Sequence, residues 1–150
     1  MSTTIDLTTV TNSIEALTIS DVTVLDVDKI VESMQMNPKT LAPRPEDFVT
    51  DMMVTRDEVS GQKLQISYVL HYRYYHCPIA GGLGGIFASY SAMMTNIIAI
   101  QLKLSDDAKL SGSMDTMEPQ PFNIGPVQDP AGNTFLGCEF QISVMQFLEV

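Results

Sequence analysis

The chain has 150 residues, the size of one ordinary domain, and its apolar content of 45% is too high for a disordered acidic chain. Its formal net charge of −10 comes from 18 acidic and 8 basic residues, so it lacks the cations that stable binding to nucleic-acid phosphates requires. Charged residues make up only 17%, below the usual quarter, which suggests that a partner covers part of the surface. We expect one domain over residues 1–150.

We expect neither a membrane span nor a signal peptide. The longest uncharged stretch, residues 74–102, contains Pro78 and four glycines, whereas a span needs about 20 mainly apolar residues in a row. The first 20 residues are polar and have no positively charged start. Cys77 and Cys138 form no CxxC motif, and we expect free thiols in a reducing compartment.

The first third of the chain predicts a short helix followed by irregular structure. Apolar residues recur at helical spacing over residues 7–19, and Asp6 could cap that helix. Residues 22–34 fit either a strand or a second short helix. An extended, non-helical segment is then expected at three prolines, Pro38, Pro43 and Pro45.

A long β-hairpin is predicted next. The first strand covers residues 48–55 and ends at a turn over residues 58–61. The second strand covers residues 64–75 and alternates with period two, so one of its faces should pack on a core. The core face is expected to comprise Leu64, Ile66, Tyr68, Leu70, Tyr72 and Tyr74.

The glycine-rich segment 81–85 predicts a flexible loop, and the strongest predicted helix follows over residues 86–104. No charge occurs between Ile86 and Leu102, whereas a surface helix normally has a charged face. Small residues also line one side of this helix, Ala92 and Ala99 among them. We therefore expect the helix to be covered on nearly every side, by the sheet and by a neighbouring molecule.

The C-terminal part predicts more strands. Short strands are expected at residues 112–118 and 122–127, followed by a turn at residues 129–133 and a last strand at residues 134–147. The whole order predicts an α+β domain: a mainly antiparallel β-sheet with a long β-hairpin, flanked by two or three α-helices.

No residue pattern points to catalysis, a cofactor or a metal. His71 and His76 should point to opposite faces of their strand, and so should the neighbours His76 and Cys77, which is poor geometry for a metal or for a nucleophile and its base. The glycine-rich segment lacks the Lys-Ser/Thr pair of a phosphate-binding loop. The ten methionines fill core gaps by default, but methionine also suits irregular contact surfaces.

Three segments together resemble the tail terminator, or tail completion, proteins of long-tailed bacteriophages. The first, residues 41–51, is a proline-rich stretch that leads into a strand. The second, residues 66–82, is the aromatic strand that ends in Cys77-Pro78-Ile79-Ala80-Gly81-Gly82. The third is Asn-Ile-Gly-Pro-Val-Gln-Asp-Pro-Ala-Gly-Asn at residues 123–133, followed by residues 135–140. The N-terminal 35 residues match the pattern least well.

The resemblance implies a structural virion protein rather than an enzyme. Six copies would form a ring that ends the tail tube, contacts the tail tube protein and the head-side connector or stopper, and lets DNA pass without binding it. Assembly would occur in the host cytoplasm, and the mature location would be the head–tail junction of the virion. The hairpin, the following loop and the uncharged helix would make the contacts to neighbouring subunits or to the tube. The expected interface residues are Tyr75, His76, Cys77, Pro78, Gly81, Gly82, Leu83, Gly84, Gly85, Ala92 and Ala99.

Two alternatives stay open. The chain could be another tail or neck component, either a tube subunit, which would polymerise into long tubes, or a head–tail stopper. It could also be a small enzyme or ligand-binding domain with a site beneath the glycine-rich segment. That last class predicts a monomer or dimer with a pocket and a perturbed histidine or cysteine.

Overall fold

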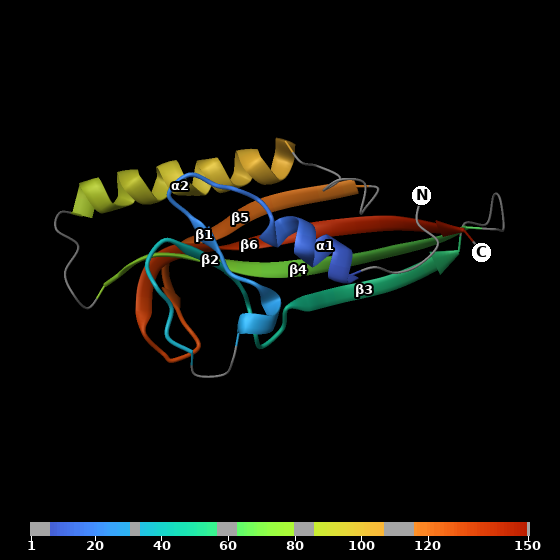
Figure 1. Cartoon of the computed structure of the whole chain (residues 1–150), viewed down its shortest axis with the longest axis horizontal. Coiled ribbons are helices and arrows are strands. Elements are labelled where there is room, and N and C mark those ends of the chain that lie inside the picture. Colours follow the sequence, from blue (N-terminus) through green and yellow to red (C-terminus); the bar gives the residue numbers. More distant parts are fainter. Residues whose placement is uncertain (1–6, 31–33, 57–62, 80–85, 107–115, 150) are drawn as a thin grey trace.

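The computed structural model of the chain describes residues 7–30, 34–56, 63–79, 86–106 and 116–149, which form a six-stranded sheet with two α-helices (Figure 1). The elements are α1 (Leu7–Glu15), β1 (Thr23–Val24), the 3-10 helix η1 (Val27–Lys29), β2 (Thr40–Pro43), β3 (Val49–Arg56), β4 (Lys63–Pro78), α2 (Ile86–Asp106), β5 (Thr116–Gln128) and β6 (Thr134–Glu149). This confirms the predicted α+β class, because every strand pair except β1–β2 is antiparallel.

The two longest strands, β4 and β6, form the centre of the sheet. The strand order is β1-β2-β4-β6-β5, and β3 also pairs with β4. Along the same edge of β4, β2 pairs with its C-terminal half and β3 pairs with its N-terminal half. The β3–β4 pairing confirms the predicted hairpin, although the turn expected at residues 58–61 lies outside the described residues.

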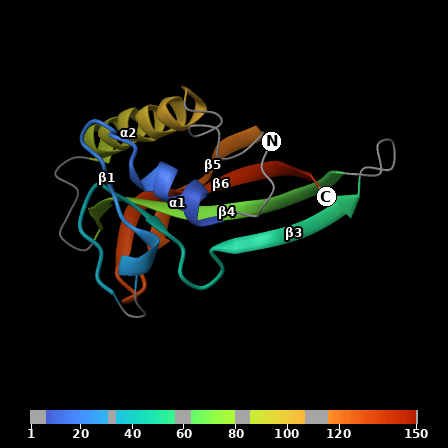
Figure 2. The same cartoon turned by 45° about the vertical axis from the view of Figure 1, so that its right-hand side comes forward.

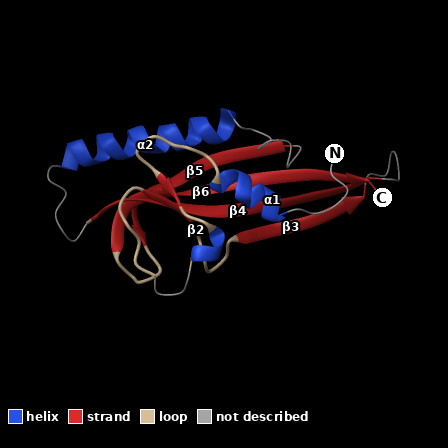
Figure 3. Cartoon of the chain, viewed as in Figure 1, coloured by secondary structure: helices blue, strands red, loops and turns tan. Residues whose placement is uncertain are grey.

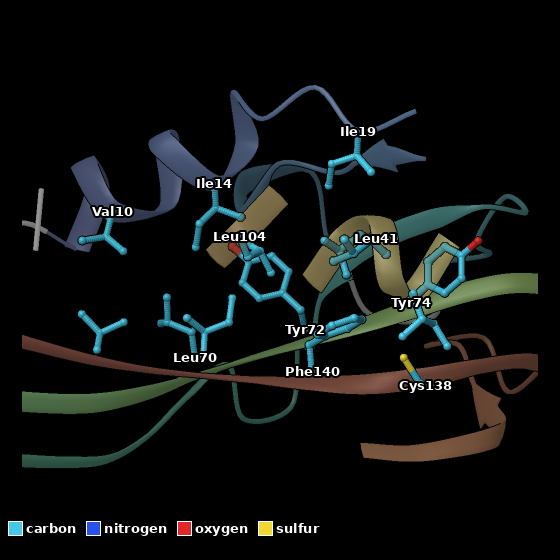
Figure 4. Packing of buried hydrophobic residues seen from close by; sticks show 14 of the residues in the cluster. Val10, Ile14, Ile19, Leu41, Leu70, Tyr72, Tyr74, Leu104, Cys138 and Phe140 are labelled. Atoms are coloured by element: carbon cyan, nitrogen blue, oxygen red, sulfur yellow. The ribbon is translucent and has the colours of Figure 1, made fainter. Parts of the chain in front are cut away.

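One face of the sheet and both α-helices enclose the main hydrophobic core. The alternation predicted for β4 is confirmed, because Ile66, Tyr68, Leu70, Tyr72 and Tyr74 are all buried on this face. The core-facing residues of β6, α1 and α2 complete it: Cys138, Phe140, Ile142, Val144, Val10, Ile14, Met93, Ile97, Ile100 and Leu104. Figure 4 shows Val10 and Ile14 of α1 pointing toward the side of the sheet that carries Leu70, Tyr72 and Phe140.

A second, smaller cluster lies on the opposite face of the sheet. Tyr75 and Phe135 meet edge to face with ring centroids 5.4 Å apart, and Met36, Ala42 and Val127 are buried around them. The cluster explains why Tyr75 is fully buried although it is on the face of β4 that carries polar residues. Alternation alone could not predict this burial, because the partners of Tyr75 come from β2, β5, β6 and the segment before β2.

The N-terminal elements differ from the prediction. The first helix ends at Glu15 rather than at residue 19, and the chain turns so that Ile19 forms a β-bridge with Val22. After the helix, the Leu17 N–H donates to the Ile14 oxygen (3.1 Å), a tighter turn of the kind that often closes a helix. Residues 22–34 contain neither a full strand nor an α-helix, because they form only β1 beside β2 and then η1, with residues 31–33 outside the described part.

The prediction of two short strands at residues 112–118 and 122–127 is wrong for the described residues, which form the single strand β5. A register shift between Phe122 and Gly125 keeps the pairing with β6 intact, and Asn123 takes φ 50° there. Pro119, Pro121 and Pro126 are tolerated within β5 because it is at the edge of the sheet.

Gly137 allows β4 and β6 to approach each other closely. A Cβ atom at this position would be 1.9 Å from the backbone oxygen of Tyr74. We therefore expect Gly137→Ala to lower the free energy of unfolding by about 1–3 kcal/mol, the usual cost of overpacking. Urea denaturation would measure this, with the exposed Ser143→Ala on the same strand as the control. Equal stability of the two variants would contradict the close approach.

Candidate functional site

Helix α2 lies along the sheet beside β5 (Figure 3). One of its faces packs into the main core. The helix begins at Ile86 and ends at Asp106, close to the prediction of 86–104. Every third or fourth residue faces the sheet, as an amphipathic helix requires. Four apolar residues on this face are at most 2% exposed, namely Met93, Ile97, Ile100 and Leu104.

The opposite face of α2 is apolar and exposed. Tyr90, Met94, Ile98 and Leu102 keep 39%, 37%, 53% and 58% of their surface accessible. Between them are small or hydroxylated residues that are also exposed: Ala88, Ser91, Ala92 and Thr95. We call these eight residues the α2 outer face. No charged side chain is present on it, whereas an ordinary surface helix carries charges there. The sheet thus covers one side of the helix, as predicted. The α2 outer face remains exposed to solvent in the single chain.

The expected interface residues lie in three different environments. Pro78 and Ala92 are exposed, so both can contact another molecule directly. Cys77 and Ala99 are half-buried and pack partly against the main core, while Tyr75 and His76 are buried within the chain. The expected residues Gly81, Gly82, Leu83, Gly84 and Gly85 lie outside the described residues. Of the two α2 residues expected at an interface, Ala92 is therefore the one on the α2 outer face.

A buried polar network fixes α2 to the sheet. The Asn96 side-chain amide donates to the Tyr74 hydroxyl (2.7 Å), and that hydroxyl shares a 2.7 Å hydrogen bond with Nδ1 of His76. Burial raises the pKa of Tyr74 to about 12, so the hydroxyl stays protonated at neutral pH. Burial, and then the nearby charge of Lys39, lowers the pKa of His76. The network gives Asn96 and His76 a structural role, which positions α2.

The two cysteines have the environment of inert thiols. Burial raises the pKa of Cys77, and it raises the pKa of Cys138 to about 12, which opposes formation of a nucleophilic thiolate. The alternation argument for His76 and Cys77 does not hold, because a register shift between Tyr75 and Cys77 places Cys77 opposite the core residue Leu136, and His76 bonds Tyr74 of the same core. His71, on the face away from the helices, contacts the Thr50 hydroxyl instead.

A charged cleft of about 700 Å³ opens on the face of the sheet away from the helices. Arg73 and Glu139 are directly opposite each other on β4 and β6, and both line the cleft. Glu139 Oε1 accepts hydrogen bonds from Arg73 (3.3 Å) and from Arg44 (2.9 Å), and Oε2 accepts one from Asn123 (3.0 Å). The alternation in the sequence places Arg73 and Glu139 on the faces of their strands that point away from the core. Only the strand register shows that the two residues are opposite each other.

The acid stability of the protein should depend on Glu139. Burial opposes its ionisation, but hydrogen bonds from Asn123 and Arg44 and the charge of Arg73 outweigh burial and lower its pKa. A carboxyl whose pKa is lower in the folded state stabilises the fold fully above its ordinary value of 4.5 and loses this contribution as the pH falls through its folded value. Urea unfolding at several pH values should therefore show a smaller acid decline for Glu139→Gln. The exposed Glu118→Gln is the control, and identical declines for the two variants would contradict the prediction.

Among the described residues, no group of three His, Cys, Asp or Glu side chains could hold a metal ion. No described helix has both the length and the apolar character needed to cross a membrane. Comparison of the chain with known protein families and with curated protein sequences found no match. The resemblance to tail terminator proteins therefore stays a prediction from the sequence.

Proposed function

We propose that this chain is a non-catalytic structural protein of the virion that assembles with copies of itself into a closed ring. In the specific form of the proposal, six copies terminate the tail tube of a long-tailed bacteriophage and join it to the head-side connector. The observation that carries the proposal is the α2 outer face, where four large apolar side chains are 37–58% exposed without an accompanying charge.

An exposed apolar face of this kind is typical of an association surface. Burying apolar area is favourable by about 25 cal/mol per Å², whereas a charge on the same face would have to be desolvated. The exposed small residues Ala88 and Ala92 would let a neighbouring backbone approach the helix closely. A closed ring also needs a second, different patch on each subunit, and the exposed Pro78 after the bulge of β4 is part of our proposed second patch.

The net charge fits passage of DNA through such a ring. A chain with a formal charge of −10 repels phosphates, so DNA could slide through a lumen without stable binding. Several of the few basic side chains also form ion pairs within the subunit. Arg44 and Arg73, for example, both pair with Glu139. This leaves little positive charge with which to hold nucleic acid.

Electron microscopy of the purified protein, alone and mixed with tail tubes, tests this proposal. The ring proposal predicts closed rings with a central opening, or rings that appear only at the ends of tubes. Open-ended tubes of the protein alone would favour a tube subunit instead. Single particles that neither close into rings nor bind tube ends would contradict the proposal.

A further inference from the structure

The two long edges of the sheet, β3 and β5, differ in their ability to accept another strand. In an antiparallel ladder, successive residues alternate in pointing their N–H and C=O groups toward one neighbouring strand and then the other. The His71 N–H donates to the Phe48 oxygen (2.9 Å) and its C=O accepts from the Arg44 N–H (2.9 Å). Odd-numbered residues of β4 therefore point their backbone groups toward β2 and β3.

The same alternation of backbone direction can be followed from β4 through β6 to β5. Because His71 is opposite Gln141 and points away from it, Gln141 points toward β5, where it is opposite Gln120. The residues on either side of Gln120 must then point outward, and both are prolines, Pro119 and Pro121. The Pro119 oxygen confirms this direction, since it accepts a hydrogen bond from the Gln101 side chain of α2 (2.9 Å).

The β5 edge is therefore closed to strand addition. Proline has no N–H, so two successive outward donors are missing, and α2 occupies one of the outward acceptors. Prolines at outward positions are a known way for an edge strand to avoid pairing with another chain.

The β3 edge has the opposite character. No proline occurs in Val49–Arg56, and Met52, Met53 and Val54 are 55%, 62% and 57% exposed. Thr55 is opposite Gln65 and points inward, so its neighbour Val54 presents its backbone groups outward. This part of β3 also extends past both helices, as two views of the molecule show (Figures 1 and 2).

We propose that β3 pairs with β3 of a second copy of this chain, so that two sheets join into one antiparallel sheet across a twofold axis. Within the described residues β5 is closed and β1 has only two residues, which leaves β3 as the one long edge that can receive β3. Antiparallel pairing also brings the Asp51 end of one strand beside the Arg56 end of the other, so the charges are complementary in both halves.

This contact is different from the ring contact proposed for α2 and does not depend on it. Pairing of β3 with itself uses the same patch on both copies and closes at two subunits, whereas a ring needs two different patches. A protein that uses both contacts would form pairs of rings. The exposed methionines of β3, expected by default to fill core gaps, would instead be covered by the second copy.

Amide hydrogen exchange of the full chain at low and high protein concentration tests the pairing directly. We expect exchange of the Val54 amide to become at least tenfold slower at high concentration, as twofold dimers form. Concentration-independent exchange at the Val54 amide would overturn the proposal, and so would irregular aggregates in place of dimers.

Val54→Pro supplies the matched variant, because it removes one outward N–H without removing a hydrogen bond to β4. We expect it to raise the dimer dissociation constant at least tenfold, measured by light scattering. The control Val54→Thr keeps the N–H and should dimerise like the parent chain. If Val54→Pro does not fold, the exchange measurement on the parent chain still decides. A folded Val54→Pro that dimerises like the parent would overturn the proposal.

Discussion

Ile98→Arg should abolish assembly of the protein while leaving the subunit folded. Ile98 is on the α2 outer face and is 53% exposed, so a longer side chain fits in the single chain without disturbing the core. Arginine also favours helix at least as well as isoleucine does. In the assembled contact, however, it would bury an unpaired charge, which costs about 3–5 kcal/mol per contact and weakens association roughly 10²–10⁴-fold.

Light scattering after size exclusion, together with circular dichroism for the fold, measures both parts of this expectation. Ala92→Arg, also on the α2 outer face, should behave in the same way. Ser143→Arg is the matched control, because Ser143 is exposed on β6 on the face of the sheet away from the helices. Normal assembly of Ile98→Arg and Ala92→Arg would show that the α2 outer face is not the ring contact.

Phe140→Ala should cause the largest loss of stability among single core substitutions. Phe140 is fully buried in β6 and is directly opposite Tyr72, whose ring meets Phe48 edge to face at 5.4 Å. Removing the phenyl group leaves a cavity beneath α1 and α2, for which the usual cost is about 3–5 kcal/mol. That is a large part of the 5–15 kcal/mol typical of a whole domain.

The free energy of unfolding of Phe140→Ala is obtained from urea denaturation followed by circular dichroism. Ser143→Ala, three residues further along the same strand and exposed, should change stability by less than about 0.5 kcal/mol. If Phe140→Ala lowers the free energy of unfolding by less than about 1 kcal/mol, the main core is not packed around Phe140 and Tyr72.

Strong local periodicity is the reason why most of the sheet and α2 could be predicted. The alternation in β4 and the apolar stripe of α2 are repeated over many residues, so the pattern indicates both the type of each element and its buried face. β6 was predicted within two residues of its C-terminal end for the same reason. The hairpin followed from two adjacent strands with a turn between them.

The parts that could not be predicted depend on contacts between distant segments. β1 exists because Thr23 and Val24 pair with Thr40 and Leu41, and nothing local requires this. The continuity of β5 depends on its edge position, where prolines are tolerated in a strand. A local reading of the sequence therefore places a boundary where the folded sheet has none.

The same distinction applies to the functional surfaces. The absence of charge on α2 was visible in the sequence, but which residues are exposed depends on how the helix lies on β5 and β6. The Arg44–Glu139 and Arg73–Glu139 ion pairs needed the strand register, because these residues are 95 and 66 positions apart. Tyr75 and His76 were expected at an interface, and the fold places both side chains inside the subunit.

The mass of the purified protein in solution, measured by light scattering after size exclusion at several concentrations, tests the central proposal most directly. Assembly through the α2 outer face predicts a closed species of defined mass, with six copies as the specific expectation, or a smaller species that becomes one when tail tubes are added. A monomer whose mass depends neither on concentration nor on added tail tubes would contradict self-assembly as the function of this chain.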